Sequence, residues 1–79
     1  MQRALKALTD EMMDRYLDWR EACSLVDDSY RRWAAATGDG AMPAHAAYLG
    51  ALDQEESAAS AYAEAVERVK SRRELRFAA

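Results

Sequence analysis

The chain has 79 residues, which is enough for one domain and too few for two. Hydrophobic residues make up 51% and charged residues 32%, a balance that excludes a disordered tail and a membrane-embedded chain. Eleven Lys and Arg stand against 14 Asp and Glu, a formal net charge of −3. Nonspecific nucleic-acid binding needs a basic surface, so we expect no nucleic-acid partner.

The sequence also indicates the cellular compartment of the protein. Cys23 is the single cysteine, so no internal disulfide can form and nothing favours an oxidising compartment. Residues 1–6 lack the apolar core of a signal peptide. No apolar run approaches the roughly 20 residues that span a bilayer. We therefore expect a cytoplasmic protein without a membrane partner.

A first helix is predicted over about residues 9–37, or from an earlier start, since residues 2–8 could add a turn or two before it. Thr9, followed by Asp10 and Glu11, has the pattern of an N-cap with acidic residues in the first turn. Apolar and semi-polar residues then recur at alternating spacings of four and three, which is a helical stripe with a period near 3.5. Its two heptad series are Leu5, Met12, Trp19, Val26, Trp33 and Thr9, Tyr16, Cys23, Tyr30, Thr37.

The chain breaks once, over residues 38–43. Gly38 can adopt the left-handed conformation that ends a helix, and Pro43 suits the first turn of the next one. A connection of about six residues favours two antiparallel neighbouring helices.

A second helix is predicted over about residues 43–76. Its stripe holds large residues together with Ala59 and Glu55: Tyr48, Leu52, Tyr62, Val66 and Val69. Beside this stripe, alanines recur every seven residues at Ala44, Ala51, Ala58 and Ala65, with a partial counterpart in Ala22, Ser29 and Ala36. Small residues at this spacing allow close approach of the two backbones.

Folding the chain about the turn makes residue numbers on facing helices sum to about 81. This register places Trp33 near Tyr48 and Trp19 near Tyr62. It also predicts the pairs Tyr30–Leu52, Cys23–Ala59 and Met12–Val69. The acidic start of the first helix then lies beside the basic end of the second, around Glu11 and Arg68.

The predicted fold class is all-α: an antiparallel two-helix hairpin with coiled-coil-like, Ala-rich close packing, in one domain over residues 1–79. Two helices form a single layer, which cannot cover its own apolar faces, and Leu17, Leu25 and Leu49 lie off the main stripe. We therefore expect a homodimer that completes a four-helix bundle. The predicted interface consists of Met12, Tyr16, Trp19, Val26, Tyr30, Trp33, Tyr48, Leu52 and Tyr62.

Glu55 is the candidate buried polar site. It occupies a stripe position between Leu52 and Ala59, where an apolar residue is expected. A buried carboxylate is costly unless it is paired. Glu55 therefore lies at the edge of the stripe, pairs with Tyr30 or a partner's Arg, or belongs to a functional site.

No catalytic residue, metal site or cofactor is predicted, and we expect no enzyme. His45 is the single histidine, so the Glu-x-x-His and His-Glu-x-x-His metal motifs are both missing. Cys23 lies on the apolar stripe, where cysteine is usually a small buried hydrophobe. The predicted register separates Cys23 from His45, which argues against a nucleophile–base pair.

The architecture resembles the small secreted W-x-G helical hairpins, whereas their motifs are missing. Those proteins carry Trp-x-Gly in the turn, whereas the turn here holds Gly38 and Gly40 without a Trp. Their Tyr-x-x-x-Asp/Glu export signal is missing too, because Tyr48 and Tyr62 are followed four residues later by Leu52 and Val66. No residue and no secretion are carried over. The sequence favours a self-associating protein–protein interaction module with a regulatory, adaptor or inhibitory role. The alternative is a bundle that binds a small ligand or a metal between its helices.

Overall fold

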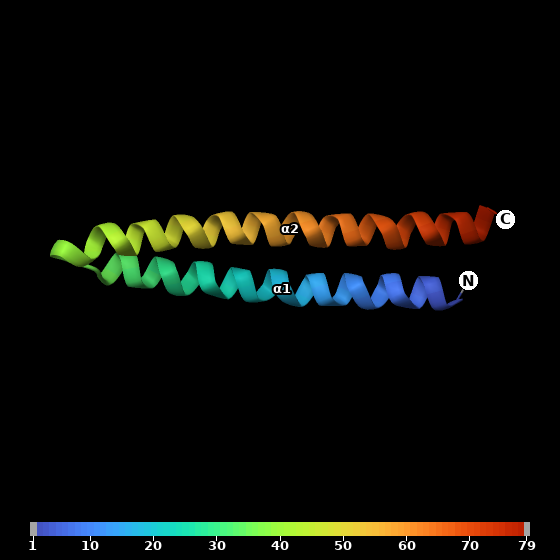
Figure 1. Cartoon of the computed structure of the whole chain (residues 1–79), viewed down its shortest axis with the longest axis horizontal. Coiled ribbons are helices and arrows are strands. Elements are labelled where there is room, and N and C mark those ends of the chain that lie inside the picture. Colours follow the sequence, from blue (N-terminus) through green and yellow to red (C-terminus); the bar gives the residue numbers. More distant parts are fainter. Residues whose placement is uncertain (1, 79) are drawn as a thin grey trace.

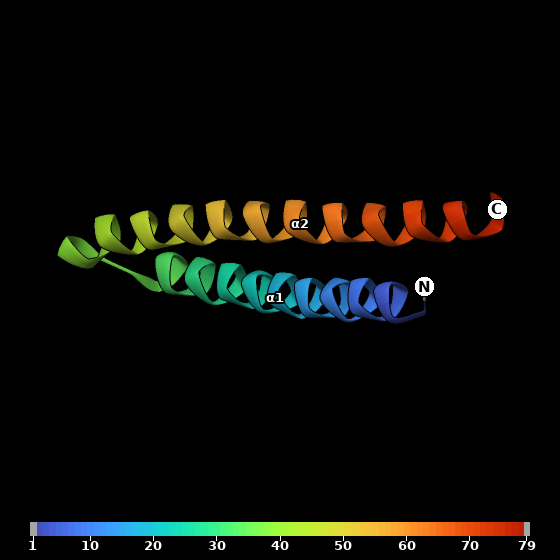
Figure 2. The same ribbon diagram turned by 45° about the vertical axis from the view of Figure 1, so that its right-hand side comes forward.

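In the computed structural model, which describes residues 2–78, the chain is a hairpin of two long helices. Helix α1 runs Gln2–Ala35, the short 3-10 helix η1 spans Gly38–Gly40, and α2 runs Ala41–Ala78. The two long helices lie antiparallel and side by side, with the two ends of the chain together and the turn at the opposite end (Figures 1 and 2). The rod measures 63 × 14 × 12 Å. The predicted all-α hairpin is confirmed, and 97% of the described residues are helical.

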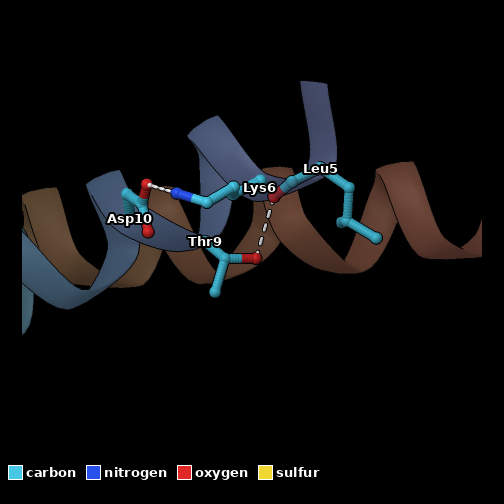
Figure 3. A network of polar contacts seen from close by, with 4 residues as sticks. All are labelled: Leu5, Lys6, Thr9 and Asp10. Carbon is cyan, nitrogen blue, oxygen red and sulfur yellow. Dashed lines mark hydrogen bonds and ion pairs between the residues drawn. The ribbon is translucent and has the colours of Figure 1, made fainter. Parts of the chain in front are cut away.

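Helix α1 begins at Gln2, so residues 2–8 add turns before Thr9, and the N-cap predicted at Thr9 is wrong. The Thr9 hydroxyl donates a hydrogen bond of 2.8 Å to the Leu5 carbonyl (Figure 3), whereas an N-cap side chain would accept one from a backbone N–H. Lys6 Nζ lies 3.0 Å from Asp10 Oδ2, an i,i+4 pair that supports the same turns. The segment before Thr9 consists of strong helix formers, which extend the helix upstream.

The turn lies two residues earlier in the chain than predicted. Helix α1 ends at Ala35, two residues before the predicted end, and Ala36 N–H donates to the Trp33 carbonyl at 3.1 Å. Gly38 has a φ of 59°, the left-handed conformation predicted for it. Helix α2 starts at Ala41, two residues before the predicted start. Pro43 still lies in the first turn, where a missing N–H removes no helical hydrogen bond.

The core of the hairpin is a line of small residues between the helices. Ala22 and Ser29 of α1 and Ala51 and Ala65 of α2 are buried, and we call these four residues the small-residue seam. Val69 is buried beside them near the open end. Their seven-residue spacing keeps them on the facing sides of the helices and lets the backbones approach closely. The close packing predicted from the alanine series is therefore present.

Candidate interaction surface

The small-residue seam divides the hairpin into two long faces. Successive helical residues turn by about 100°, which places Tyr16, Trp19 and Cys23 on one side of Ala22 and Asp18 and Leu25 on the other. We call the first side, with the α2 residues Tyr48, Leu52, Glu55, Ala59, Tyr62 and Val66, the aromatic face. We call the second side, with Arg15, Asp18, Glu21, Leu25, Gln54, Ser57 and Ala61, the acidic face.

Three rings join the helices near the middle of the aromatic face. Trp19 stacks on Tyr62 with centroids 5.9 Å apart and an interplanar angle of 10°. Tyr16 contacts the edge of Tyr62 at 5.5 Å and lies 6.1 Å from Trp19. Such ring pairs stabilise by about 0.5–1.5 kcal/mol beyond the area they bury. This cluster therefore holds α1 against α2 where the seam residues alone bury little area.

Glu55 forms a structural pair with this cluster. The Trp19 Nε1–H donates a hydrogen bond of 2.9 Å to Glu55 Oε1, and Cys23 Sγ lies 4.0 Å from the same oxygen. The donor is the Trp19 indole, whereas the sequence analysis predicted a pair with Tyr30 or with an Arg of a partner chain. This pairing explains how a carboxylate occupies a stripe position, because its oxygen has a donor on the facing helix.

A second ring cluster lies near the turn. Trp33 stacks on Tyr48 at 5.4 Å and contacts the His45 ring at 4.5 Å, while Tyr30 meets the edge of Tyr48 at 5.7 Å. Beside it lies an open apolar notch of about 410 Å³, lined by Trp33, Ala41, Met42, His45, Ala46 and Leu49. His45 thus packs on an indole near the first turn of α2.

These contacts test the predicted register. The pairs Trp33–Tyr48 and Trp19–Tyr62 are confirmed, and Arg68 Nη2 lies 2.7 Å from Glu11 Oε1 at the open end, where opposite charges were expected to meet. Tyr30 also contacts the ring of Tyr48, which lies one helical turn before Leu52, its predicted partner. A heptad pattern does not resolve a shift of one helical turn, because a ring reaches residues on both adjacent turns.

The acidic face has a different composition. It carries an open groove of about 400 Å³ lined by Arg15, Asp18, Glu21, Ala22, Leu25, Gln54, Ser57, Ala58 and Ala61. Arg15 is half-buried, with its Nη1 3.4 Å from Asp18 Oδ2 and its Nε buried without a hydrogen-bond partner among the described residues. Arg15 was not among the predicted site residues. Its position in the sequence could have revealed it, because it lies seven residues before Ala22, where the series of small residues predicts a small side chain.

The nine residues of the predicted interface all lie along the contact between α1 and α2. Eight of them are half-buried within the single chain, and Tyr30 alone is exposed, at 53%. The large apolar side chains left exposed are mostly others: Met13, Leu17, Leu25, Met42, Leu49 and Leu75. Leu17, Leu25 and Leu49 were predicted to need cover, and within the hairpin itself they remain exposed.

The arrangement keeps His45 apart from Cys23 and Glu55. His45 contacts Trp33, whereas Cys23 and Glu55 lie beside Trp19, and ten residues of helix separate His45 from Glu55, about 15 Å along the axis. Across residues 2–78 there is no group of three His, Cys, Asp or Glu side chains placed to hold a metal ion. Within the same residues neither helix is long and apolar enough to cross a membrane.

Comparisons with known protein families, with curated proteins and with solved structures give no significant match.

Proposed function

We propose that this chain is a small helical interaction module that self-associates and acts by binding another protein. The observation that carries the proposal is the incomplete core. Among the described residues no large side chain is fully buried, and the buried hydrophobic residues are three alanines and one valine. Chains of this size rarely fold stably on such a core without a partner.

The surface composition points the same way. Seven large apolar side chains are exposed, up to 83% for Met42. They do not share one face, since Leu25 lies on the acidic face and Tyr30 on the aromatic face. A single exposed apolar residue needs no explanation, but a set of this size on a rod two helices thick favours an assembly that covers part of it. Tyr and Trp, which line the aromatic face, are also the residue types enriched in binding hot spots.

The proposal assigns no catalysis to the chain. A ligand or metal held between the helices, the other function the sequence allows, has less support. Its polar candidates, Glu55 and His45, contact two separate ring clusters, one around Trp19 and one around Trp33. The oxygen of Glu55 that faces the hairpin already accepts a hydrogen bond.

Light scattering behind a sizing column tests the self-association directly. We expect a mass of twice 8.9 kDa that holds on tenfold dilution from high micromolar concentration. Mass must be measured, because a rod of 63 × 14 × 12 Å elutes early whatever its oligomeric state. A monomer that keeps full helical circular dichroism at every concentration would refute self-association and leave these side chains for a different protein.

A further inference from the structure

The aromatic face has a symmetric sequence on both helices. On α1 it reads the same in both directions about Cys23, with Tyr16 and Tyr30 seven residues to either side. On α2 the small Ala59 lies midway between two aliphatic residues, Leu52 and Val66, again seven residues to either side. A small centre with matching large residues at equal distances is self-complementary about a two-fold axis through that centre.

The two centres lie at the same level of the rod. Trp19 stacks on Tyr62 and Trp33 on Tyr48, and in each pair the residue numbers sum to 81. Cys23 and Ala59 sum to 82, so they fall level with each other between these two pairs. One two-fold axis, drawn across the hairpin at this level, therefore passes both centres.

We propose that a second copy of this chain docks on the aromatic face, antiparallel to the first, about a two-fold axis at Cys23 and Ala59. This inference rests on the self-association proposed above and specifies its surface and geometry. In such a dimer α1 lies on α1 of the second copy and α2 on α2. Tyr16 then meets Tyr30 of the second copy, Leu52 meets Val66, and each small centre meets its own equivalent.

The charges at the edge of the face agree with this geometry. Arg20 and Asp27 stand three residues before and four residues after Cys23, at the outer edge of the aromatic face, and both are exposed. Neither takes part in the ion pairs found within residues 2–78. The antiparallel dimer places each Arg20 opposite Asp27 of the second copy, so that the pair forms twice.

The other two-fold arrangement places like charges together. With the axis along the rod, both turns lie at one end and α1 faces α2 of the second copy at equal height. Asp27 then lies close to Glu56, since their numbers sum to 83, and both carboxylates are exposed. Like charges in contact across an interface oppose association, which favours the antiparallel dimer.

The available area suits a stable dimer. The rod is 63 Å long and 14 Å wide, and a standard interface takes about 800 Å² from each partner. Because Cys23 lies near the middle of the rod, two antiparallel copies overlap along most of their length. The exposed Tyr30 and the half-buried Tyr16 and Leu52 would be covered.

Cross-linking through the axis is the first test. The wild-type chain contains only Cys23, half-buried and free, so a short bis-maleimide should convert most of the protein to a covalent dimer. A Cys23→Ser, Ala59→Cys variant should cross-link as well, because Ala59 also lies at the axis. The matched control, Cys23→Ser with Ser57→Cys, puts an exposed thiol on the acidic face and should remain monomeric on a denaturing gel.

Charge reversal is the second test, measured as the dissociation constant by analytical ultracentrifugation. R20E and D27R should each weaken the dimer by about tenfold, and the double variant R20E/D27R should regain most of the wild-type affinity. E21R, an exposed position on the acidic face, should leave the constant within about twofold.

The outcomes separate this inference from the proposed function. A monomeric wild-type chain would overturn this inference and the self-association, and would leave only the binding of a different protein. A dimer by light scattering that cross-links through neither Cys23 nor Ala59→Cys, and that R20E does not weaken, would overturn only the face and axis. Cross-linking at both axis positions together with rescue in R20E/D27R would establish the antiparallel dimer.

Discussion

The two long faces of the hairpin share one backbone and one small-residue seam, yet they do different things. On the aromatic face, ring stacking and the Trp19–Glu55 hydrogen bond join α1 to α2 across the seam. On the acidic face, Arg15 and Asp18 pair within one helix, and an open groove separates their side chains from Gln54 and Ser57. The aromatic face therefore stabilises the hairpin, whereas the acidic face contributes little beyond solvation.

This difference follows from side-chain reach and chemistry. The seam keeps the backbones close, so rings on either side can stack across it, while carboxylates gain more from water than from each other. Covering a face of stacked rings and few charges costs less desolvation free energy than covering a face of exposed charges. That is why we assign association to the aromatic face.

The strongest test of the comparison is removal of one ring. Trp19→Ala removes the stack on Tyr62 and leaves the Glu55 carboxylate without its donor, so we expect a loss of about 3–5 kcal/mol in the free energy of unfolding. Leu25→Ala, the matched truncation on the acidic face, should cost under about 1 kcal/mol because Leu25 is 40% exposed. Urea denaturation at one fixed protein concentration measures both. Equal losses in the two variants would refute the division of roles.

A second test acts on the seam that separates the faces. Ala65 is 1% exposed, so Ala65→Leu must push the helices apart, at a cost of about 1–3 kcal/mol. Ala63→Leu, two residues away and exposed, should change stability by less than about 0.5 kcal/mol and serves as the control. If Ala65→Leu were stabilising, the seam would be a gap that larger side chains can fill, and the close packing would not be needed.

A third test concerns the single polar link on the aromatic face. Glu55→Gln keeps an acceptor for the Trp19 indole and should cost under about 1 kcal/mol. Glu55→Ala leaves that N–H unpaired in a half-buried place and should cost about 1–2 kcal/mol. Thermal unfolding followed by circular dichroism distinguishes them. Equal effects of the two substitutions would mean that the hydrogen bond does not form in solution.

The smallest effect is expected at the open end. Arg68 and Glu11 meet at 2.7 Å, but both side chains are 43% exposed, so Arg68→Ala should cost under about 1 kcal/mol. The difference from wild type should shrink further in 1 M salt, where screening acts over about 3 Å. A loss above about 2 kcal/mol that persists in high salt would show that this pair holds the helix ends together, which the exposure does not predict.

Much of this molecule follows from the order of its residues. The heptad spacing of Trp19 and Trp33 against Tyr48 and Tyr62 places two ring pairs correctly, because a helix has a fixed rise and turn and a short loop leaves two helices one way to face each other. Gly38 takes its left-handed conformation in the turn for a local reason too, since this conformation strongly favours glycine.

The start of α1 shows where local rules mislead. Thr9 and its acidic neighbours fit an N-cap, but the helix formers before Thr9 continue the helix and turn its hydroxyl inward to Leu5. Capping patterns mark places where a helix is able to begin. Whether it does depends on the segment upstream.

The sequence by itself determined a helical hairpin, the approximate level of its ring pairs and the small residues between its helices, because these depend on periodicity along one chain. Only the tertiary structure decided that Trp19 is the donor to Glu55, that Arg15 Nε is buried without a partner among the described residues, and that Met42 and Leu49 stay exposed beside Trp33. These features depend on which side chain reaches which across the helix pair. Distances of a few ångströms between helices are set by packing, and a repeat of seven residues does not encode them.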